Sequence, residues 1–349
     1  MRILVVTPAR AGARTGNRVT AQRWAGLLRG LGHRVTVATA YRGQRCDLLV
    51  ALHARRSLAS IVAFRRRHAS GPLVVALTGT DLYADLRRST ATGRALDLAT
   101  RLVVLQPTAL RALPPGARAK ARVIVQSAAG PWRRIRAGAS TFDVCVLGHL
   151  RAVKDPFRAA AAARLLPRSS RIRVLHAGAA LEPGTAARAR AEQRRNPRYR
   201  WLGNRPHAEA MSLLARCRLL CLTSKLEGGA NVVSEAAAAG VPVLSSRIDG
   251  SVGLLGARHP GYFAVGDTRA LAGLLLRAER DPRFYARLGR SVRRLARLVR
   301  PERERGAWAS LLRELVRRRS GTRSPRSPRT RSVRPAASRG ALPSASLSK

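Results

Sequence analysis

The segment SKLEGGANVVSEAAAAG holds two glutamates, Glu227 and Glu235, with seven residues between them. Gly228 and Gly229 follow the first glutamate and open a run of helical period that we expect to reach Ala239. Backbone N–H groups at such a helix start bind anions, because the positive end of the helix dipole lies behind them. The first glutamate can accept hydrogen bonds from sugar hydroxyls, and the second can hold a diol such as ribose. This pattern favours a site for a diphosphate sugar; the other interpretation is a solvated loop and helix.

A second group of polar residues lies in GHLRAVKDPF, where Gly148, His149 and Lys154 follow an expected strand. We expect Asp155 to be the N-cap and Pro156 the first residue of the next helix. Loops at the carboxyl ends of parallel strands are the usual ligand sites of open α/β sheets, so Lys154 and His149 should face the same crevice as the glutamates. An ammonium group there would stabilise a nucleotide diphosphate as it leaves.

The elements that must position these residues alternate between short β-branched runs and longer Ala, Leu and Arg runs of helical period, which indicates βαβ units and parallel sheets. The expected strands of the first half are 3–7, 34–39, 47–52, 73–78, 101–106 and 122–127. Those of the second half are 142–148, 171–178, 199–203, 218–224, 241–246 and 261–266. Helices are expected between them, for example at 20–31 and 58–68. The predicted fold class is α/β, with two Rossmann-like, doubly wound parallel-sheet domains.

Changes in composition set the expected domain boundaries. Residues 1–128 form the first domain, and a Gly- and Pro-containing linker covers 129–141. The second domain spans 142–300, and an Arg-rich amphipathic helix follows at 301–318. The remaining residues, 319–349, are rich in Arg, Ser and Pro and lack apolar periodicity, so we expect a disordered tail.

The chain is strongly basic, with 67 Lys and Arg, 18 Asp and Glu and a formal charge of +49. Such a balance suits nucleic-acid binding, because a positive field attracts phosphate backbones. The arginines are spread through every segment, however, and only 4% of residues are aromatic, whereas single-strand binders need aromatic platforms. We therefore favour compositional drift and keep a basic nucleic-acid-binding protein as an alternative.

Several other classes are disfavoured by motifs that the sequence lacks. Cys217 and Cys221 have no second pair or His cluster to complete a zinc site, so buried thiols in a reducing compartment are expected. The turn after the first strand has no GxGxxG, and the chain has no GxxxxGK followed by Ser or Thr, which argues against a nicotinamide dehydrogenase and a P-loop NTPase. Without a signal-peptide core or 18 consecutive apolar residues, we expect a cytoplasmic protein with no transmembrane segment.

The GxLxxxK loop, the EGGANVVSE motif and the following GVPV together resemble family 4 glycosyltransferases over roughly residues 1–300. The resemblance implies the GT-B architecture, in which an N-terminal acceptor domain and a C-terminal donor domain face a central cleft, with no cofactor and no metal. It assigns catalytic roles to Lys154 and Glu227, the donor diphosphate to Lys154, the transferred sugar to Glu227 and ribose to Glu235. His149 stands where the family usually has Arg. The implied donor-binding residues are Gly148, His149, Lys154, Glu227, Gly228, Gly229, Ala230, Asn231 and Glu235.

The opening MRILVVTPARAGARTGNRVTAQRWAG, then LVVALTGTDLY and GHLRAVKDPFR, resemble a branch of that family, the selenosugar synthases of selenoneine biosynthesis. Those enzymes join selenophosphate to the sugar of a UDP-sugar such as UDP-N-acetylglucosamine, which forms a carbon–selenium bond and releases UDP. The implied partners are a UDP-sugar donor and selenophosphate or another small acceptor, and we expect no specific nucleic-acid partner.

A selenium nucleophile is already anionic near neutral pH, so such an enzyme needs an anion pocket and correct orientation more than a strong base. Arginines near the first loop, Arg10 and Arg14, can hold a phosphate-like acceptor or can be solvated. Asp81 can order its loop, contact the acceptor or cap a helix. The candidate acceptor-binding residues are Gly16, Asn17, Arg18, Thr78 and Asp81.

One alternative within the same fold is a hexosyltransferase that acts on a hydroxyl of a lipid or small metabolite, with its arginines attracted to anionic membranes. The alternative from a different class is the nucleic-acid-binding protein, whose Arg-rich tail would carry the activity.

Overall fold

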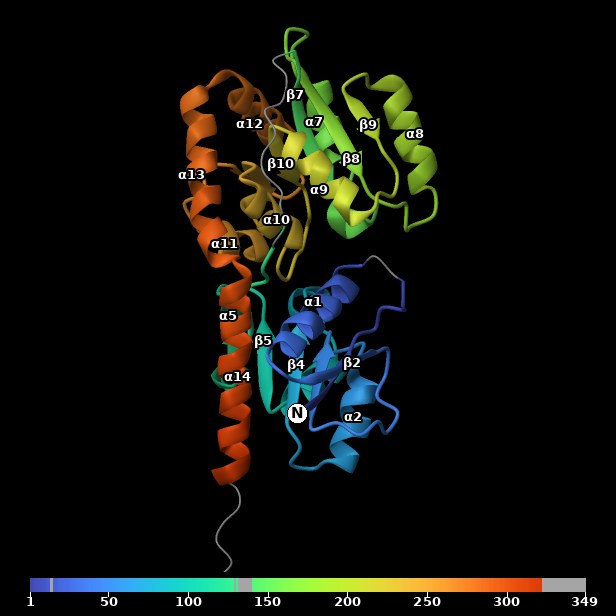
Figure 1. Ribbon diagram of the computed structural model, residues 1–349. Coiled ribbons are helices and arrows are strands. Elements are labelled where there is room, and N and C mark those ends of the chain that lie inside the picture. The colour runs from blue at the N-terminus through green and yellow to red at the C-terminus, as the bar shows by residue number, and fades with distance from the viewer. Residues whose placement is uncertain (13–14, 129, 131–139, 322–349) are drawn as a thin grey trace, which may run out of the picture.

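The computed structural model describes residues 1–12, 15–128, 130 and 140–321. These residues form two α/β domains, each built on a six-stranded sheet whose strand pairs are all parallel. Figure 1 shows the domains stacked end to end, with the last helix running along the N-terminal domain. The predicted fold class is confirmed.

The N-terminal sheet has the strand order β2-β1-β3-β4-β5-β6. Its central strands are buried at every position, as expected where helices cover both faces of a parallel sheet. Helices α1 and α14 pack on one face, and α2 and α4 pack on the other. The strands are β1 Arg2–Val6, β2 Arg34–Ala38, β3 Leu48–Leu52, β4 Leu73–Leu77, β5 Arg101–Val104 and β6 Ala121–Val123. The helices are α1 Gly16–Gly30, α2 Leu58–Arg67, α3 Thr80–Tyr83, α4 Thr90–Leu98, α5 Ala109–Ala112 and α6 Pro115–Ala119.

The C-terminal sheet has the order β12-β11-β10-β7-β8-β9 and is also covered on both faces. Its strands are β7 Phe142–Leu147, β8 Ile172–Ala177, β9 Tyr199–Trp201, β10 Leu219–Leu222, β11 Val243–Ser246 and β12 Tyr262–Phe263. A 3-10 turn, η1 Ala152–Lys154, precedes the helices α7 Arg158–Arg164, α8 Thr185–Arg195, α9 His207–Arg216, α10 Asn231–Ala239, α11 Asp249–Leu255, α12 Thr268–Arg280 and α13 Pro282–Leu298.

Helix α14, Pro301–Gly321, leaves the C-terminal domain and packs along the N-terminal one (Figure 1). Trp308 meets Trp24 of α1 edge to face, with ring centroids 4.8 Å apart. Glu304 is 1% exposed and accepts hydrogen bonds from the Trp24 indole N–H at 2.7 Å and from the Ser127 backbone N–H at 2.8 Å. A buried carboxylate is stable only with such partners, so α14 is fixed to the N-terminal domain.

Each of the twelve expected strands overlaps a strand of the structure, which is usually one to three residues shorter. The expectation that Asp155 caps the next helix is wrong: Asp155 ends η1 with φ 45°, and α7 begins only at Arg158. The chain needs this left-handed residue to turn out of η1, so the helix starts later than Pro156 suggests. Most of the expected linker 129–141 and residues 322–349 of the expected tail lie outside the described residues, while 319–321 belong to α14.

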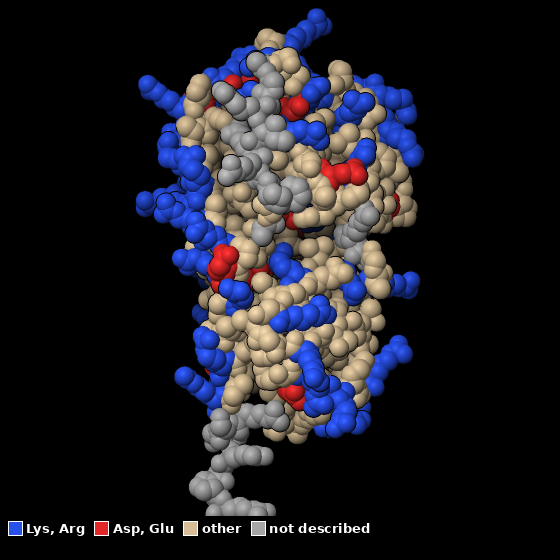
Figure 2. Space-filling model, in the orientation of Figure 1, with Lys and Arg blue, Asp and Glu red and all other residues tan. Residues whose placement is uncertain are grey.

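All four cysteines are free and buried, as the sequence predicts. Figure 2 shows Lys and Arg side chains over both domains of the visible face, with few acidic side chains among them. In the part of the chain that the structure describes, no helix is both long and apolar enough to cross a bilayer.

Candidate active site

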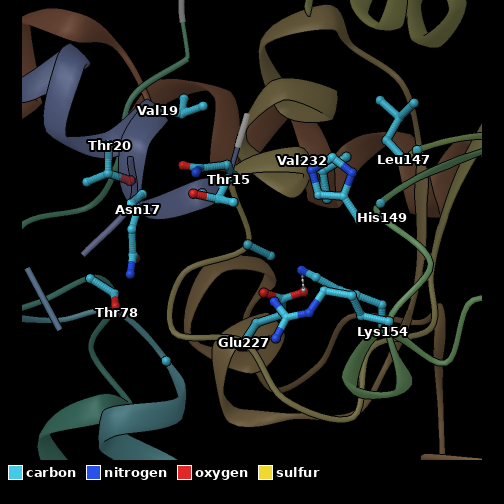
Figure 3. Close-up of a pocket in the computed structure, with 18 of the residues that line it drawn as sticks. Thr15, Asn17, Val19, Thr20, Thr78, Leu147, His149, Lys154, Glu227 and Val232 are labelled. Atoms are coloured by element: carbon cyan, nitrogen blue, oxygen red, sulfur yellow. Dashed lines mark hydrogen bonds and ion pairs between the residues drawn. The ribbon is translucent and has the colours of Figure 1, made fainter. Parts of the chain in front are cut away.

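A cavity of about 840 Å³ lies between the two domains and is lined by both. Figure 3 shows its two walls, with Asn17 and Thr78 on one side and His149, Lys154 and Glu227 on the other. The wall from the N-terminal domain is called here the N-terminal wall, and the opposite one the C-terminal wall. The predicted site residues that line the cavity are Gly16, Asn17, Thr78, Gly148, His149, Lys154, Glu227, Gly228, Gly229, Ala230, Asn231 and Glu235.

Lys154 and Glu227 form an ion pair at the centre of the C-terminal wall (Figure 3). Lys154 is the last residue of η1, which follows β7 in the chain. Glu227 lies in the loop that follows β10, the strand next to β7 in the sheet. The Ser224 hydroxyl donates to the same Glu227 oxygen at 2.6 Å. The pair is partly open to the cavity, with side chains 31% and 13% exposed. A cation and a carboxylate are thus held in place for a ligand before it arrives.

The loop after Glu227 touches the N-terminal wall so closely that only glycine fits. A Cβ on Gly228 would lie 2.3 Å from the backbone oxygen of Thr78, and one on Gly229 would lie 2.6 Å from the Leu105 Cβ. Both contacts are far inside van der Waals distance. The two glycines therefore let the Glu227 loop and the Thr78 loop meet across the cleft.

Helix α10 begins at Asn231, directly behind these glycines, and its N-terminus faces the cavity. The Asn231 side-chain oxygen accepts a hydrogen bond from the Arg23 guanidinium of α1 at 3.3 Å. In the amide orientation that satisfies its neighbours, Gln126 donates to the backbone oxygen of Gly229 at 3.2 Å. Arg23 also pairs with Glu304 of α14 at 3.3 Å. Side chains of the N-terminal domain thus hold the start of α10.

Glu235 lies in the second turn of α10 and contacts His207, the first residue of α9, with 3.0 Å between Oε1 and Nε2. The hydrogen bond to Glu235 raises the pKa of His207 above its ordinary value. The Glu235 side chain is 17% exposed and lines the cavity, so it can also accept hydrogen bonds from a ligand. Sequence inspection missed His207, which enters the site from a different loop.

His149 is oriented by the loop that follows β8: its Nδ1 accepts a hydrogen bond from the Ala179 backbone N–H at 3.1 Å. The loop of His149 is held in turn by His176, whose Nε2 lies 3.0 Å from the Gly148 carbonyl oxygen. Burial lowers the pKa of His176 to about 4, so this ring is neutral and donates to that carbonyl. The ring of His149 is therefore fixed in the C-terminal wall, as Figure 3 shows.

Two of the predicted acceptor residues do not line the cavity, Arg18 and Asp81. Asp81 is fully buried, and its carboxylate accepts from the backbone N–H groups of Thr78 at 2.9 Å and Gly79 at 2.8 Å. It also accepts from Ala54 at 2.9 Å. Asp81 therefore orders the loop after β4, which is one of the roles expected for it, and its buried carboxylate does not line the cavity.

Other predicted positions have different outcomes. Arg10 is exposed and lines the cavity, whereas Arg14 lies outside the described residues. His53, Arg56 and Thr80 also line the N-terminal wall and were missed. Their positions in the sequence could have indicated them. His53, for example, directly follows β3, and polar residues at the carboxyl ends of parallel strands tend to bind ligands.

The two walls differ in charge. Among the described lining residues the only carboxylates are Glu227 and Glu235, and both belong to the C-terminal wall. The N-terminal wall offers arginine, amide and hydroxyl groups and one histidine. The described residues contain no cluster of three or more His, Cys, Asp or Glu side chains that could hold a metal ion.

Comparison with known proteins finds one matching family model. Residues 135–295 match the family model described as glycosyl transferases group 1. No curated protein matches the chain.

Among solved structures, HepE of Anabaena in complex with UDP is 19% identical, with a TM-score of 0.71 over 90% of this chain and 100% of that one. Sucrose-phosphate synthase of Thermosynechococcus elongatus is 15% identical, with a TM-score of 0.72 over 91% of this chain and 99% of that one. These neighbours share the two-domain GT-B fold. Residues 135–295 thus match the group 1 glycosyltransferases, and the chain shares the GT-B fold of these neighbours.

Proposed function

We propose that this protein transfers the sugar of a UDP-sugar to selenophosphate. The first candidate for the donor is UDP-N-acetylglucosamine. The selenium atom attacks the anomeric carbon and forms the carbon–selenium bond. The bond between that carbon and the β-phosphate oxygen breaks, and its electron pair leaves with UDP. The immediate product carries the selenophosphate group on its anomeric carbon. Hydrolysis of the P–Se bond by water then releases phosphate and leaves the selenosugar that selenoneine biosynthesis requires, and this reaction would take place in the cytoplasm.

The C-terminal wall supports a nucleotide-sugar donor. The α10 N-terminus and Lys154 are both suited to a diphosphate, since one offers backbone N–H groups and the other a positive charge. Glu227 is placed between Lys154 and the glycine loop, where it can orient a sugar, and Glu235 is left for ribose. HepE, which shares the fold, has been solved with UDP and with UDP-glucose, which supports UDP as the nucleotide.

The observation that carries the choice of acceptor is the N-terminal wall, which has no carboxylate among its described lining residues. An alcohol must lose a proton as it attacks, and a carboxylate or a histidine with a free ring nitrogen commonly takes it. Both ring nitrogens of His53 are hydrogen-bonded within the protein. An acceptor that is already an anion needs no such base and gains from the positive charges of Arg10 and Arg56. Selenophosphate meets both conditions.

The experiment is to incubate the purified protein anaerobically with UDP-N-acetylglucosamine, with and without selenophosphate, and to follow UDP and sugar products by mass spectrometry. Selenophosphate-dependent UDP release together with a selenium-containing sugar is the expected result. Donor binding with no such product would overturn the acceptor and leave the glycosyltransferase assignment in place.

Parallel incubations with lipid and small-molecule alcohols test the hydroxyl-acceptor alternative, in which transfer to an alcohol would replace the selenosugar. Deletion of residues 319–349 tests the nucleic-acid alternative. The truncated protein should transfer sugar at the full rate, whereas a nucleic-acid-binding protein that works through its Arg-rich tail should lose its activity.

A further inference from the structure

His53 has an unusual backbone for a buried residue. It is 3% exposed, lies directly behind β3 and lines the cavity, yet its φ is 69°, in the left-handed region that L-residues rarely adopt. In the described part of the chain, the one other non-glycine residue with positive φ is Asp155, next to Lys154. Strain of this kind is often kept where a side chain must be held for function, and here both examples border the cleft.

The ring of His53 has a defined direction of hydrogen bonding. The Arg56 backbone N–H lies 3.4 Å from Nδ1, so Nδ1 accepts. Nε2 lies 2.9 Å from the Thr80 hydroxyl oxygen. Burial lowers the pKa of His53, which favours the neutral ring, and the acceptor role of Nδ1 assigns the proton of that ring to Nε2. Nε2 therefore donates to the Thr80 oxygen.

This donation determines what Thr80 can offer to a ligand. A hydroxyl that accepts from a histidine keeps its own proton for another acceptor. Thr80 is partly exposed and lines the cavity, so that proton is available to a molecule in the cleft. Arg56, two positions beyond Ala54 on the same turn, adds a cation to this part of the wall.

The position of Thr80 along the chain connects this group to the donor side. Thr80 follows Thr78 and Gly79, whose backbone meets Gly228 across the cleft. Asp81 holds the same loop through the N–H groups of Thr78 and Gly79. A molecule bound by Thr80 therefore lies on a rigid loop that abuts the Lys154–Glu227 side of the cavity.

We propose that His53 and Thr80 form a positioning pair for the acceptor, in which the Thr80 hydroxyl donates to an oxyanion oxygen of the acceptor and His53 fixes the direction of that hydroxyl. The pair binds the oxygen end of a phosphate-like acceptor and leaves its nucleophilic atom to face the donor sugar. This inference rests on the anionic acceptor of the proposed function and names the residues that would select it.

The test separates the KM for selenophosphate from the KM for UDP-N-acetylglucosamine in two pairs of variants. Thr80→Val removes the hydroxyl and keeps the shape, so the KM for selenophosphate should rise about tenfold or more while the KM for the donor stays the same. Thr80→Ser should restore the wild-type value. His53→Asn tolerates positive φ but places no donor at the Nε2 position, so it should also raise the KM for selenophosphate.

A double variant, His53→Asn with Thr80→Val, should be no worse than Thr80→Val alone, because the two residues act through one hydroxyl. Arg55→Ala is the matched control. Arg55 lies on the same turn, is exposed and pairs with Asp85 away from the cavity. Equal rises in both KM values for Thr80→Val, or no change in either, would overturn the proposal.

A binding measurement keeps the pair testable if selenophosphate is not turned over. Thiophosphate is titrated into the UDP-bound wild-type protein and into Thr80→Val by calorimetry. Weaker binding to Thr80→Val, with thiophosphate binding intact in Thr80→Ser, supports the pair even where the proposed reaction fails. Equal binding, or none to the wild type, overturns the pair.

Discussion

The two walls of the cleft present opposite chemistry to whatever lies between them. The C-terminal wall combines two carboxylates, a lysine and a helix N-terminus, whereas the N-terminal wall offers arginines, hydroxyls and a neutral histidine. A donor that carries sugar hydroxyls, ribose and diphosphate needs both hydrogen-bond acceptors and positive charge. An anionic acceptor needs donors alone. Under the proposed function the donor belongs to the C-terminal wall and the acceptor to the N-terminal wall, and this assignment can be tested wall by wall.

The largest effect is expected from Lys154→Ala, which removes the charge that would stabilise the departing diphosphate. We expect kcat to fall about 10²- to 10³-fold, with little change in the KM for the acceptor. Steady-state kinetics against both substrates measures the effect. Lys225→Ala is the control, because Lys225 is exposed on the adjacent loop that carries Glu227 and does not line the cavity. A normal turnover rate in Lys154→Ala would exclude this role for the lysine.

Gly228→Ala tests the contact between the walls. Its Cβ would meet the Thr78 carbonyl at 2.3 Å, so the two walls must move apart and the substrates must separate. We expect kcat/KM for both substrates to fall by up to about 10²-fold, because a shift of this size misaligns the reacting atoms. Gly26→Ala in α1 is the control, since a Cβ there meets no atom within 4 Å. If Gly228→Ala affected only one substrate, the walls would act independently.

Glu235→Ala should affect the donor alone. Loss of the carboxylate that we propose to hold ribose should weaken UDP binding about tenfold, because hydrogen bonds to charged groups are stronger than neutral ones. Calorimetric titration with UDP measures this, and the KM for the acceptor should stay constant. Unchanged UDP affinity would remove Glu235 from the donor site.

The smallest effect is expected from His207→Ala and depends on pH. Because Glu235 raises the pKa of folded His207, the pair stabilises the protein fully below the unfolded pKa of about 6.5 and loses this effect as pH rises through the raised value. The His207 side chain is 60% exposed, so the loss in unfolding free energy should be below about 1 kcal/mol near pH 5.5 and absent near pH 8.5. Denaturant unfolding at both pH values measures it, and an equal loss at both would contradict an ionic contact.

The fold followed from the sequence because the strands are short runs of mostly apolar residues that alternate with longer helical runs, so the pattern marked all twelve. The ends of elements were less certain. Asp155 and Pro156 suggested a helix start by their residue types alone, but the backbone turns out of η1 through a left-handed Asp155 first. The backbone conformation needed to leave η1 therefore overrides the capping preference of Asp155 and the helix-start preference of Pro156.

The C-terminal wall was predictable because its main residues lie in two continuous motifs, each in one loop and the helix behind it. The N-terminal wall is assembled from loops after β1, β3 and β4, and no single segment shows it. Asp81 was expected to order its loop, contact the acceptor or cap a helix, and only the structure shows that its carboxylate is used by the loop. His53 and Thr80 are ordinary residues in sequence, and their relation depends on a backbone angle that no sequence pattern specifies.

The return of α14 to the N-terminal domain means that the chain passes between the domains twice. Residues 142–300 are therefore an insertion within the N-terminal domain and not a simple second half. To build a hybrid enzyme with a different donor specificity, residues 142–300 should be replaced as one segment, while residues 301–321 are kept together with residues 1–128. A hybrid joined at one point would separate Glu304 from Trp24 and Ser127, leaving a carboxylate and its donors buried without each other.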